Sequence, residues 1–408
     1  MNELSIKMSS VILQWPSFGP YHTARLRACQ ALAPEGVEVV GIAVAGQVQG
    51  RPWVADGDLG GVKVVTLFPD AMYHELPAQD VKCAMKRALD ELQPAAMGVS
   101  GYGMTDSRAA LKWCCRNGAT RVLMTESKAD DAPRVWWKEF LKRRLVARFG
   151  SALCGGSPHR AYLEQLGMKP ELIFDRYDVV DNERFWQAAE AARANPEPFG
   201  QLPGLDPNHL DQPYFLVSSR FIDRKNLPRL LSAYHAYRQK YPQGWRMIIL
   251  GTGPDEELLR KQVAEESIPD VVFAGFQQFD ELIAYYAFAG AFVHPALQEQ
   301  WGLVVNEAMA CGLPIGVAET VGAAYDLVQD DVNGYKFDPA NVVSMKNALT
   351  RLAADPDHRE RMANSSREII QSWTPEHFAK HFWAAVGPPV AEVRVASSSC
   401  SRPLPGCS

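Results

Sequence analysis

The sequence predicts an α/β protein with two domains, each built on a parallel sheet that helices cover. Three observations lead to this prediction. The chain has 408 residues, which is too long for one ordinary core and suits two domains of ordinary size. Short apolar runs alternate with helical patterns in both halves, as in parallel sheets with helical crossovers. Between the halves lies a stretch rich in Pro, Gly, Asn and Asp that lacks any period, as an interdomain linker does.

These patterns set the domain boundaries. We expect an N-terminal domain over residues 1–195, a linker over 196–212 and a C-terminal domain over 213–372. A last helical pattern covers 373–386. Residues 387–408 are rich in Pro and Ser and low in apolar residues, which predicts a disordered tail.

Composition restricts the classes of function. The formal net charge of −5 gives no general attraction to nucleic acid. The eight cysteines show no Cys-x-x-Cys and no Cys/His spacing typical of zinc sites, so reduced cysteines are the simplest account. The first residues, MNELSIKMSS, lack the apolar core of a signal peptide, and no run reaches the length of a membrane helix. We therefore expect a cytoplasmic protein.

In the N-terminal half, short apolar runs predict strands at 10–15, 37–44, 62–68, 95–100, 122–125 and 151–155. Ligands of such sheets bind beyond the carboxyl ends of the strands. The loop after the first strand, PSFGPYH, contains Gly19, where the backbone could approach a ligand closely. His22 closes the loop, and two interpretations are open for it: a surface position at the helix start, or a contact with substrate.

Residues 133–149, PRVWWKEFLKRRLVARF, have the pattern of a basic amphipathic helix. Trp136 and Trp137 stand at its start, and six Lys and Arg side chains follow its length. Such helices can lie on anionic membranes. The alternative, which we favour, is an ordinary helix whose aromatic side packs on the sheet while its charges are solvated.

In the C-terminal half, strands are predicted at 214–218, 246–250, 271–274 and 290–293. Arg220 and Lys225 follow the first of these strands, and Arg224 is a rival cation. Two cations at a strand's carboxyl end suit a diphosphate, because Arg offers a planar fork and Lys a point charge; a solvated loop is the alternative. Gly251 and Gly253 follow the second strand and let the backbone approach a ligand.

The most informative stretch is GAFVHPALQEQWGLVVNEAMACGLPIG, residues 290–316. An apolar strand leads into a loop with Glu299, and a helix over 303–311 carries Glu307. Eight residues at helical rise cover only about 12 Å. The helix start at Gly302 and Leu303 offers free backbone N–H groups and the positive end of a dipole. One strand–loop–helix unit therefore presents two carboxylates as hydroxyl acceptors, with amide donors between them.

This stretch resembles the donor-binding signature of family 4 glycosyltransferases, retaining enzymes of the GT-B fold. The signature consists of an acid, an aromatic residue, Gly, Leu and a second acid, followed by A-M-A-C-G-x-P. Here it stands as EQWGLVVNEAMACGLP, with Trp301 where phenylalanine is commoner. Relatives also carry an arginine, four residues and a lysine, as Arg220 and Lys225 do. A further segment, DVVDNERF, resembles the family's G-V-D-x-x-x-F with Asp178 where glycine is usual.

The resemblance implies a GT-B fold, in which two Rossmann-like α/β domains with parallel sheets face a central cleft. It implies a UDP- or GDP-sugar donor bound mostly by the C-terminal domain. Glu299 would then meet the hydroxyls of the donor sugar and Glu307 the ribose. Donor contacts are likewise expected from Trp301 and from the amides of Gly302 and Leu303. The resemblance also implies that the main chain at Phe276 holds the nucleobase and that the donor approaches the backbone of Gly251 and Gly253. Gly19 would touch either the donor phosphates or the acceptor.

On the acceptor side the sequence departs from the family. Many relatives have a histidine in the loop after the strand at 122–125, where this chain has Glu126, Ser127 and Lys128. With His22, these residues are our acceptor-side candidates. The expected reaction is retaining transfer of a sugar to a hydroxyl of a glycan, a lipid-linked or a small-molecule acceptor. Two other functions stay open: a GT-B nucleotide-sugar epimerase that uses Glu126 with His22, and a nucleotide-sugar binding protein without turnover.

We expect neither a metal ion nor another cofactor, because the family neutralises the departing diphosphate with cations and helix dipoles. Two Asp-x-Asp segments are read as loop residues instead of metal ligands: Asp56-Gly57-Asp58 and Asp355-Pro356-Asp357. For Asp130 and Asp131, a favourable acidic pair at a helix start and an acceptor contact are equally open.

Overall fold

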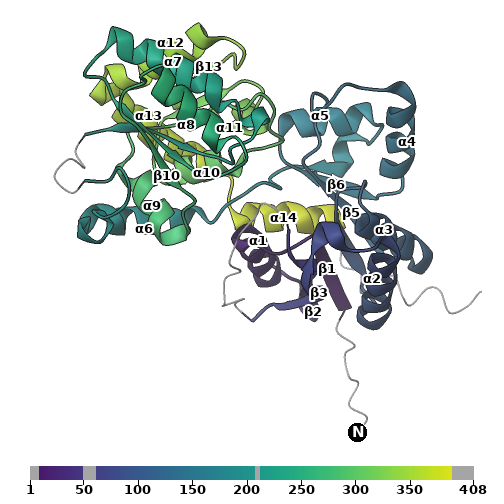
Figure 1. The fold of residues 1–408 in the computed structure, drawn as a ribbon. Helices are drawn as coiled ribbons and strands as arrows, with labels where there is room; N and C mark the ends of the chain where they lie inside the picture. Colours follow the sequence, from purple (N-terminus) through teal and green to yellow (C-terminus); the bar gives the residue numbers. More distant parts are fainter. Residues whose placement is uncertain (1–8, 49–60, 207–211, 388–408) are drawn as a thin grey trace, which may run out of the picture.

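A computed structural model describes residues 9–48, 61–206 and 212–387, and it consists of two α/β units that lie side by side (Figure 1). Several sequence predictions concern residues outside these ranges. They are the N-terminal start, the Asp56-Gly57-Asp58 segment, part of the linker and nearly all of the expected tail. In the described parts of the chain, no helix combines the length and the apolarity that crossing a bilayer requires.

The N-terminal unit contains a parallel sheet of seven strands in the order β3-β2-β1-β4-β5-β6-β7. The chain winds outward from β1 to one edge and then returns to the other side of β1, so the order reverses between β1 and β4. Ligand sites of open α/β sheets lie at such a reversal. The strands are β1 (Ser9–Trp15), β2 (Val37–Gln47), β3 (Lys63–Met72), β4 (Ala96–Ser100), β5 (Thr120–Thr125), β6 (Ser151–Cys154) and β7 (Ile173–Phe174).

Helices cover both faces of this sheet, which explains why its central strands are nearly continuous apolar runs. The helices are α1 (Pro20–Ala31), α2 (Ala78–Leu92), α3 (Thr105–Asn117), α4 (Trp136–Val146) and α5 (Ser157–Gln165). The next helix, α6 (Asn182–Ala194), lies against the C-terminal unit (Figure 1), where Phe185 packs on Phe279 with 5.2 Å between ring centroids. This helix therefore belongs with the C-terminal unit and not with the N-terminal domain predicted over residues 1–195.

Helix α4 differs from the interpretation that we favoured from sequence. Its aromatic side does not pack on the sheet: Trp136 is 81% exposed and Trp137 48% exposed. Phe140 and Leu141 are exposed as well, and Val146 is the buried residue of the helix. That interpretation is therefore wrong, because no other element covers these side chains within the described residues.

The C-terminal unit contains a parallel sheet of six strands in the order β10-β9-β8-β11-β12-β13, which reverses between β8 and β11. The two sheets confirm the predicted α/β fold class. The strands are β8 (Tyr214–Ser218), β9 (Arg246–Leu250), β10 (Val271–Gly275), β11 (Ala291–His294), β12 (Ile315–Ala318) and β13 (Gly334–Phe337). The helices are α7 (Leu227–Lys240), α8 (Glu256–Glu265), α9 (Phe279–Phe288), α10 (Leu303–Ala310), α11 (Gly322–Leu327), α12 (Val342–Ala354) and α13 (Pro356–Ile370).

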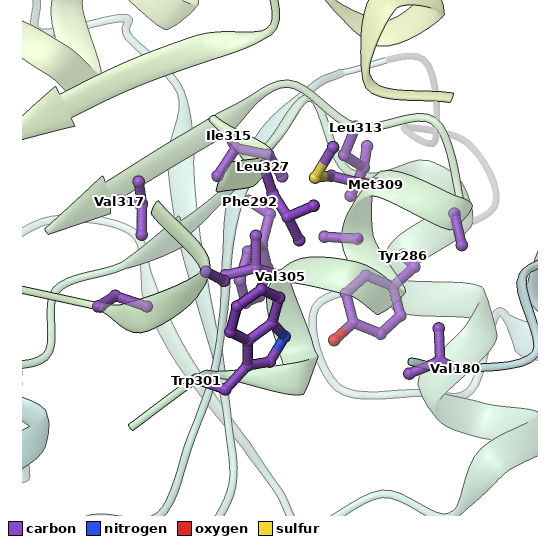
Figure 2. Close-up of a cluster of buried hydrophobic side chains, with 14 of the residues drawn as sticks. Val180, Tyr286, Phe292, Trp301, Val305, Met309, Leu313, Ile315, Val317 and Leu327 are labelled. Carbon is purple, nitrogen blue, oxygen red and sulfur yellow. The ribbon is translucent and has the colours of Figure 1, made fainter. Parts of the chain in front are cut away.

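Trp301 lies in the core of this unit, next to the inner face of α10. Figure 2 shows its ring beside Val305, in a cluster that also contains Phe292 and Met309. The indole is almost fully buried and stacks on Trp373, with 4.7 Å between ring centroids. Burying so large an aromatic surface anchors the start of α10 to the end of α13.

The last helix, α14 (Pro375–Val386), crosses back to the N-terminal unit, where it lies in yellow among the purple and blue elements of Figure 1. Its backbone carbonyl at Ala385 accepts a hydrogen bond from Ser151 Oγ at 2.6 Å. Trp383 Nε1 donates to the carbonyl of Cys29 at 3.0 Å. Asp355 precedes α13 and caps its N-terminus, where its side chain accepts hydrogen bonds from two backbone amides. This position agrees with the prediction that Asp355 is a loop residue.

Candidate active site

A cavity of ≈ 970 Å³ lies between the two units, at the carboxyl ends of β1, β8 and β9. Its wall contains several residues that the sequence singled out from separate places in the chain. The structure brings together Arg220, Lys225, Gly251, Gly253, Phe276, Glu299 and Glu307. The N-terminal unit contributes Ser17 and Phe18 from the loop after β1 and Tyr21 from the first turn of α1.

Three cations gather at this wall: Arg220, Arg224 and Lys225. They follow β8, where a short 3-10 helix over Asp223–Lys225 precedes α7. Arg224 Nη1 donates to the carbonyl of Gln298 at 3.0 Å, which ties the cation loop to the loop that carries Glu299. The cluster concentrates positive charge at the carboxyl end of one strand, which favours a bound anion.

Glu299 pairs directly with one of these cations. Its carboxylate accepts a hydrogen bond from Lys225 Nζ, and Arg224 lies 3.5 Å away. Burial raises the pKa of Glu299, but the neighbouring His294 and Lys225 more than offset burial, so that the pKa lies well below its usual range. Glu299 is therefore a carboxylate at neutral pH. Lys225 is itself largely buried, which lowers its pKa, and Glu299 opposes that shift.

His294 is a site residue that sequence reasoning missed. It ends β11, is fully buried, and its Nε2 lies 3.5 Å from Glu299 Oε2. Burial and the charge of Lys225 lower the pKa of His294, so the ring is neutral at physiological pH. A lone histidine in an apolar run carries no signal of its own, and only the fold places it behind a carboxylate.

Glu307, on α10, accepts hydrogen bonds from two tyrosines. Tyr286 of α9 donates to Oε2 at 2.7 Å, and Tyr21 donates to Oε1 from the opposite unit. Glu307 is 2% exposed, and burial raises the pKa of its carboxyl to about 7, although both tyrosine hydroxyls act to lower it. Sequence reasoning did not single out Tyr21, which lies in the first turn of α1 between the two candidates Gly19 and His22.

The glycines of the C-terminal wall allow close packing of neighbouring loops. Gly251 has a φ of +119°, and a Cβ there would lie 1.8 Å from the carbonyl oxygen of Ser219. At Gly253 a Cβ would lie 2.3 Å from the carbonyl oxygen of Phe221. Gly302, with a φ of +98°, is the residue before α10, and Leu303 opens that helix. At Gly251 and Gly253, the space that a side chain would need is thus filled by the backbone of the loop after β8.

Gly19 and His22 form the start of α1. The amide of Gly19 donates to His22 Nδ1 at 3.0 Å, so the imidazole caps the helix. The ring of His22 packs against Trp15, with 4.9 Å between centroids. Neither Gly19 nor His22 is in the cavity wall, although the nearby Phe18 and Tyr21 are.

The loop after β5 carries the other acceptor-side candidates, and it also lies outside the cavity wall. Glu126 forms a hydrogen bond with Asp178; burial and Glu126 raise the pKa of Asp178 well above its usual range. Glu126, from the loop where many relatives have a histidine, and Asp178, which stands where glycine is usual, are thus in contact. Ser127 donates its amide to Thr125 Oγ1. Lys128 is almost fully buried, and its ammonium donates to Asp130 at 2.7 Å and to the carbonyl of Thr320 at 3.1 Å.

Replacing Glu307 by glutamine is expected to stabilise the fold at pH 8 and to leave it unchanged at pH 5. Burial raises the pKa of this carboxyl from an ordinary 4.5 to about 7, so the folded state holds its proton more tightly than the unfolded chain. The stability due to that proton is fully present below the unfolded-state pKa of 4.5, and it is lost as the pH rises through the folded-state pKa of about 7. The shift corresponds to about 3 kcal/mol.

Urea unfolding of wild type and variant at both pH values measures this difference. Glu257→Gln, on the exposed face of α8, is the matched control for loss of a surface carboxylate. An identical pH dependence in wild type and Glu307→Gln would contradict the perturbed pKa.

Comparison with known proteins identifies the family of the C-terminal unit. Residues 206–369 match the family described as Glycosyl transferases group 1. The chain is 34% identical over 155 residues to sulfoquinovosyl transferase SQD2 of Arabidopsis thaliana, covering 37% of this chain and 29% of that protein. It is 29% identical over 203 residues to the GDP-mannose-dependent alpha-(1-6)-phosphatidylinositol monomannoside mannosyltransferase of Mycolicibacterium smegmatis, covering 48% of this chain and 50% of that protein. The chain thus spans half or less of the length of these two relatives.

Among solved structures, HepE of Anabaena in complex with UDP and glucose superposes with a TM-score of 0.64 at 16% identity. The match covers 92% of this chain and 98% of that one, so it extends over both units. The chain therefore has the GT-B fold, and its residues 206–369 form a domain of the group 1 glycosyl transferase family.

Proposed function

We propose that the protein is a retaining glycosyltransferase, which moves a sugar from a UDP- or GDP-sugar to an acceptor hydroxyl. The observation that carries the proposal is the convergence of Arg220, Lys225, Glu299 and Glu307 on one cavity between the two units. These residues come from the loops after β8 and β11 and from α10. The relatives named above are sugar transferases, and one of them is GDP-mannose-dependent.

In this proposal the donor diphosphate lies against Arg220 and Lys225. Charge-assisted hydrogen bonds to phosphate strengthen as negative charge builds up on the leaving group. The amides at the start of α10, around Gly302 and Leu303, add the positive end of a helix dipole. These groups neutralise the departing diphosphate, and we therefore propose that transfer requires no metal ion.

Glu299 and Glu307 divide the remaining donor contacts in this proposal. Glu299 accepts from hydroxyls of the sugar, where its ionised state also favours positive charge at the anomeric carbon. Glu307 accepts from the ribose hydroxyls. The acceptor enters from the N-terminal side of the cavity, past Phe18 and Tyr21, and its hydroxyl proton passes to the leaving phosphate on the same face of the sugar.

Incubation with a panel of UDP- and GDP-sugars tests the function. Release of free nucleotide, fastest when a suitable acceptor is present, is the expected result. Conversion of the sugar without nucleotide release would indicate an epimerase, which none of the comparisons supports. Tight binding without any conversion would indicate a nucleotide-sugar binding protein. Screening donors first by thermal shift selects the nucleotide and sugar for the kinetic assay.

We also propose that helix α4 brings the N-terminal unit to an anionic membrane surface. Its exposed side carries Trp136, Trp137, Phe140 and Leu141. Exposed cations accompany these rings: Arg144 lies 4.4 Å from the ring of Phe140. Aromatic rings at headgroup level and neighbouring basic residues are the features that hold a helix on an anionic bilayer. One relative, by its name, acts on a phosphatidylinositol mannoside, and a lipid-linked acceptor would suit such a surface.

The protein is expected to sediment with phosphatidylglycerol vesicles at low salt and to be released as salt rises, because screening shortens the range of surface charge. Trp136→Ala should weaken binding at every salt concentration, since this ring is 81% exposed and its loss costs the fold little. Leu258→Ala, an exposed apolar residue on α8, is the matched control. Absence of binding at low salt would exclude the membrane role.

A further inference from the structure

The loop that carries Glu299 is anchored from both units. We define the donor loop as residues 298–302, between β11 and α10. Within its own unit, the carbonyl of Glu299 accepts from the amide of Gly322 at 3.2 Å, and the carbonyl of Trp301 accepts from Ala323 at 3.0 Å. Arg224 of the same unit donates to the carbonyl of Gln298 at 3.0 Å. Further anchors come from the N-terminal unit, and they contact the residues on either side of Glu299.

His159 provides the most direct of these anchors. It lies in the first turn of α5 and is fully buried. Its Nδ1 accepts from the amide of Gly156 at 3.1 Å, so the ring proton is on Nε2, which donates to the carbonyl of Gln300 at 3.0 Å. Burial lowers the pKa of His159, although the bond to Gln300 opposes the shift, and the neutral ring keeps this tautomer. The same ring packs 5.8 Å from that of Trp301, the next residue of the donor loop.

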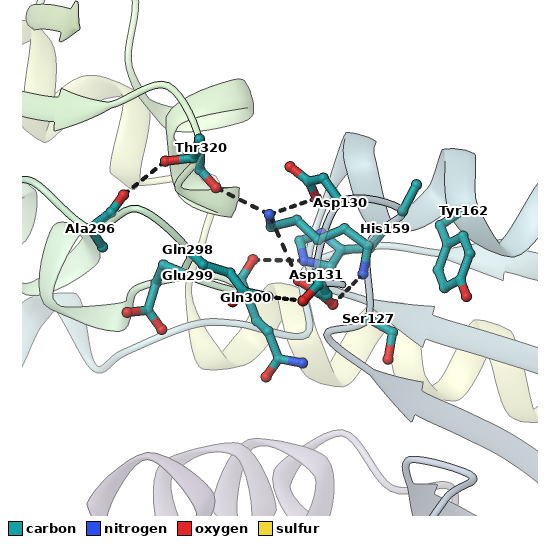
Figure 3. A network of polar contacts seen from close by, with 12 residues as sticks. Ser127, Asp130, Asp131, His159, Tyr162, Ala296, Gln298, Glu299, Gln300 and Thr320 are labelled. Atoms are coloured by element: carbon teal, nitrogen blue, oxygen red, sulfur yellow. Dashed lines mark hydrogen bonds and ion pairs between the residues drawn. The ribbon is translucent and has the colours of Figure 1, made fainter. Parts of the chain in front are cut away.

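Further contacts surround this hydrogen bond, as Figure 3 shows. The side chain of Gln298 donates to the carbonyl of Asp131. The residues before and after Glu299 are therefore both bonded to the N-terminal unit. Lys128 adds its bond to Thr320, whose hydroxyl donates to the carbonyl of Ala296 at 2.8 Å.

The two units also approach each other too closely for any side chain at Gly156. A Cβ there would lie 2.1 Å from Asp326 Oδ2 and 3.0 Å from the ring of Trp301. The next residue, Ser157, donates its amide to the same Asp326 carboxylate at 2.8 Å. The two units are thus closely packed beside the donor loop, where His159 also contacts Gln300.

We infer that His159 is a positioning residue, through which the N-terminal unit fixes the donor loop and directs the Glu299 carboxylate toward the donor sugar. This inference rests on the proposed function. His159 acts through the carbonyl of Gln300, so the sugar end of the donor site is complete only when the two units are together. The nucleotide end, at Glu307 on α10, does not depend on this hydrogen bond.

A pair of His159 variants separates the two ring nitrogens. Glutamine places a donor near the position of Nε2, whereas asparagine reaches only the position of Nδ1 and can still accept from Gly156. His159→Asn is expected to lower kcat about tenfold, the effect of one hydrogen bond, with the Kd for nucleoside diphosphate within about twofold of wild type. His159→Gln should restore most of kcat.

Ser157→Ala is the matched control, because it removes a contact to Asp326 in the same interface without touching the donor loop. If Ser157→Ala lowers kcat as much as His159→Asn, the role of His159 is general docking of the units, and the inference is overturned. A larger loss of nucleotide affinity than of kcat in His159→Asn would overturn it equally.

Hydrogen exchange gives a readout that needs no turnover. The amides of Gly322 and Ala323 report on the donor loop, since they donate to the carbonyls of Glu299 and Trp301. We expect them to exchange about tenfold faster in His159→Asn and at the wild-type rate in Ser157→Ala. Unchanged exchange in His159→Asn would overturn the inference. Failure of the wild type to bind nucleotide or convert nucleotide-sugars would instead overturn the proposed function, and the exchange result would stand independently.

Discussion

Arg220→Ala is expected to lower kcat/KM for sugar transfer by about 10²–10³-fold, with a thermal unfolding midpoint close to that of wild type. The guanidinium lies in the cavity wall where the proposal places the departing diphosphate, and its removal takes away a donor that acts most strongly as charge develops. Arg220 is exposed, so its truncation removes little buried surface from the fold. Kinetics with the donor selected by the screen, together with thermal unfolding, measure both parts of this result.

Arg260→Ala is the matched control for Arg220→Ala. It also removes one positive charge from the exposed surface of the C-terminal unit, but its partner is Glu256 on the same helix. Lys225→Ala is less informative, because Lys225 is buried against Glu299 and its loss would leave that carboxylate uncompensated. Full transfer activity in a normally folded Arg220→Ala protein would show that the diphosphate assignment is wrong.

Glu299→Gln is expected to lower kcat about 10²-fold while nucleoside diphosphate binds nearly as well as to wild type. The carboxylate is held ionised by His294 and Lys225 and lies where positive charge develops on the sugar in the proposed reaction. A nucleoside diphosphate has no sugar at that end, so its affinity is insensitive to the substitution. Titration calorimetry with UDP and GDP, beside steady-state kinetics, separates the two quantities.

Glu307→Gln is expected to have the opposite effect to Glu299→Gln: it should weaken nucleotide binding and change kcat little. This carboxylate is proposed to accept from the ribose, which changes little during the reaction, so ground state and transition state should be weakened alike. We expect nucleoside diphosphate affinity to fall about tenfold, the effect of one charged hydrogen bond, with a modest change in kcat. Unchanged nucleotide affinity in Glu307→Gln would remove the ribose assignment, and a large affinity loss in Glu299→Gln would remove the sugar assignment.

The sequence predicted the fold class well because apolar period and helix length are local properties. Every strand of the C-terminal sheet up to β11 follows an apolar run that was assigned from sequence. Strand-end position also brought Arg220 and Lys225 to the same wall as Glu299, since parallel strands end at one edge of a sheet. Loops that follow strands could therefore be placed without knowing any contact.

The residues that sequence reasoning missed act across long separations. Tyr21 bonds to a carboxylate 286 positions later in the chain, and His159 to a carbonyl 141 positions later. No periodicity or spacing rule reaches across two domains. Trp301, in contrast, was predicted to contact the donor by resemblance to the family signature. Its ring is instead buried against Trp373.

The exposure of the aromatic residues of helix α4 could not be predicted from the sequence either. A helix with aromatic and basic residues has the same pattern whether its aromatic side is covered by a sheet or faces solvent. The difference depends on which elements surround the helix, and these come from distant parts of the chain. Trp136 and Trp137 could therefore be assigned to a surface only once the fold was known.

The path of α14 has a consequence for a cleaved form of the molecule. The chain leaves the N-terminal unit after β7 and returns to it with α14, so two covalent connections join the halves. A single proteolytic cut within residues 196–212 would leave α6 on the N-terminal fragment, although this helix packs on α9 and α10 of the C-terminal unit. The C-terminal fragment would still hold α14, whose Phe378 and Phe382 are fully buried. The two fragments would behave as a complementing pair, and the nicked protein would remain assembled until denaturant releases that helix.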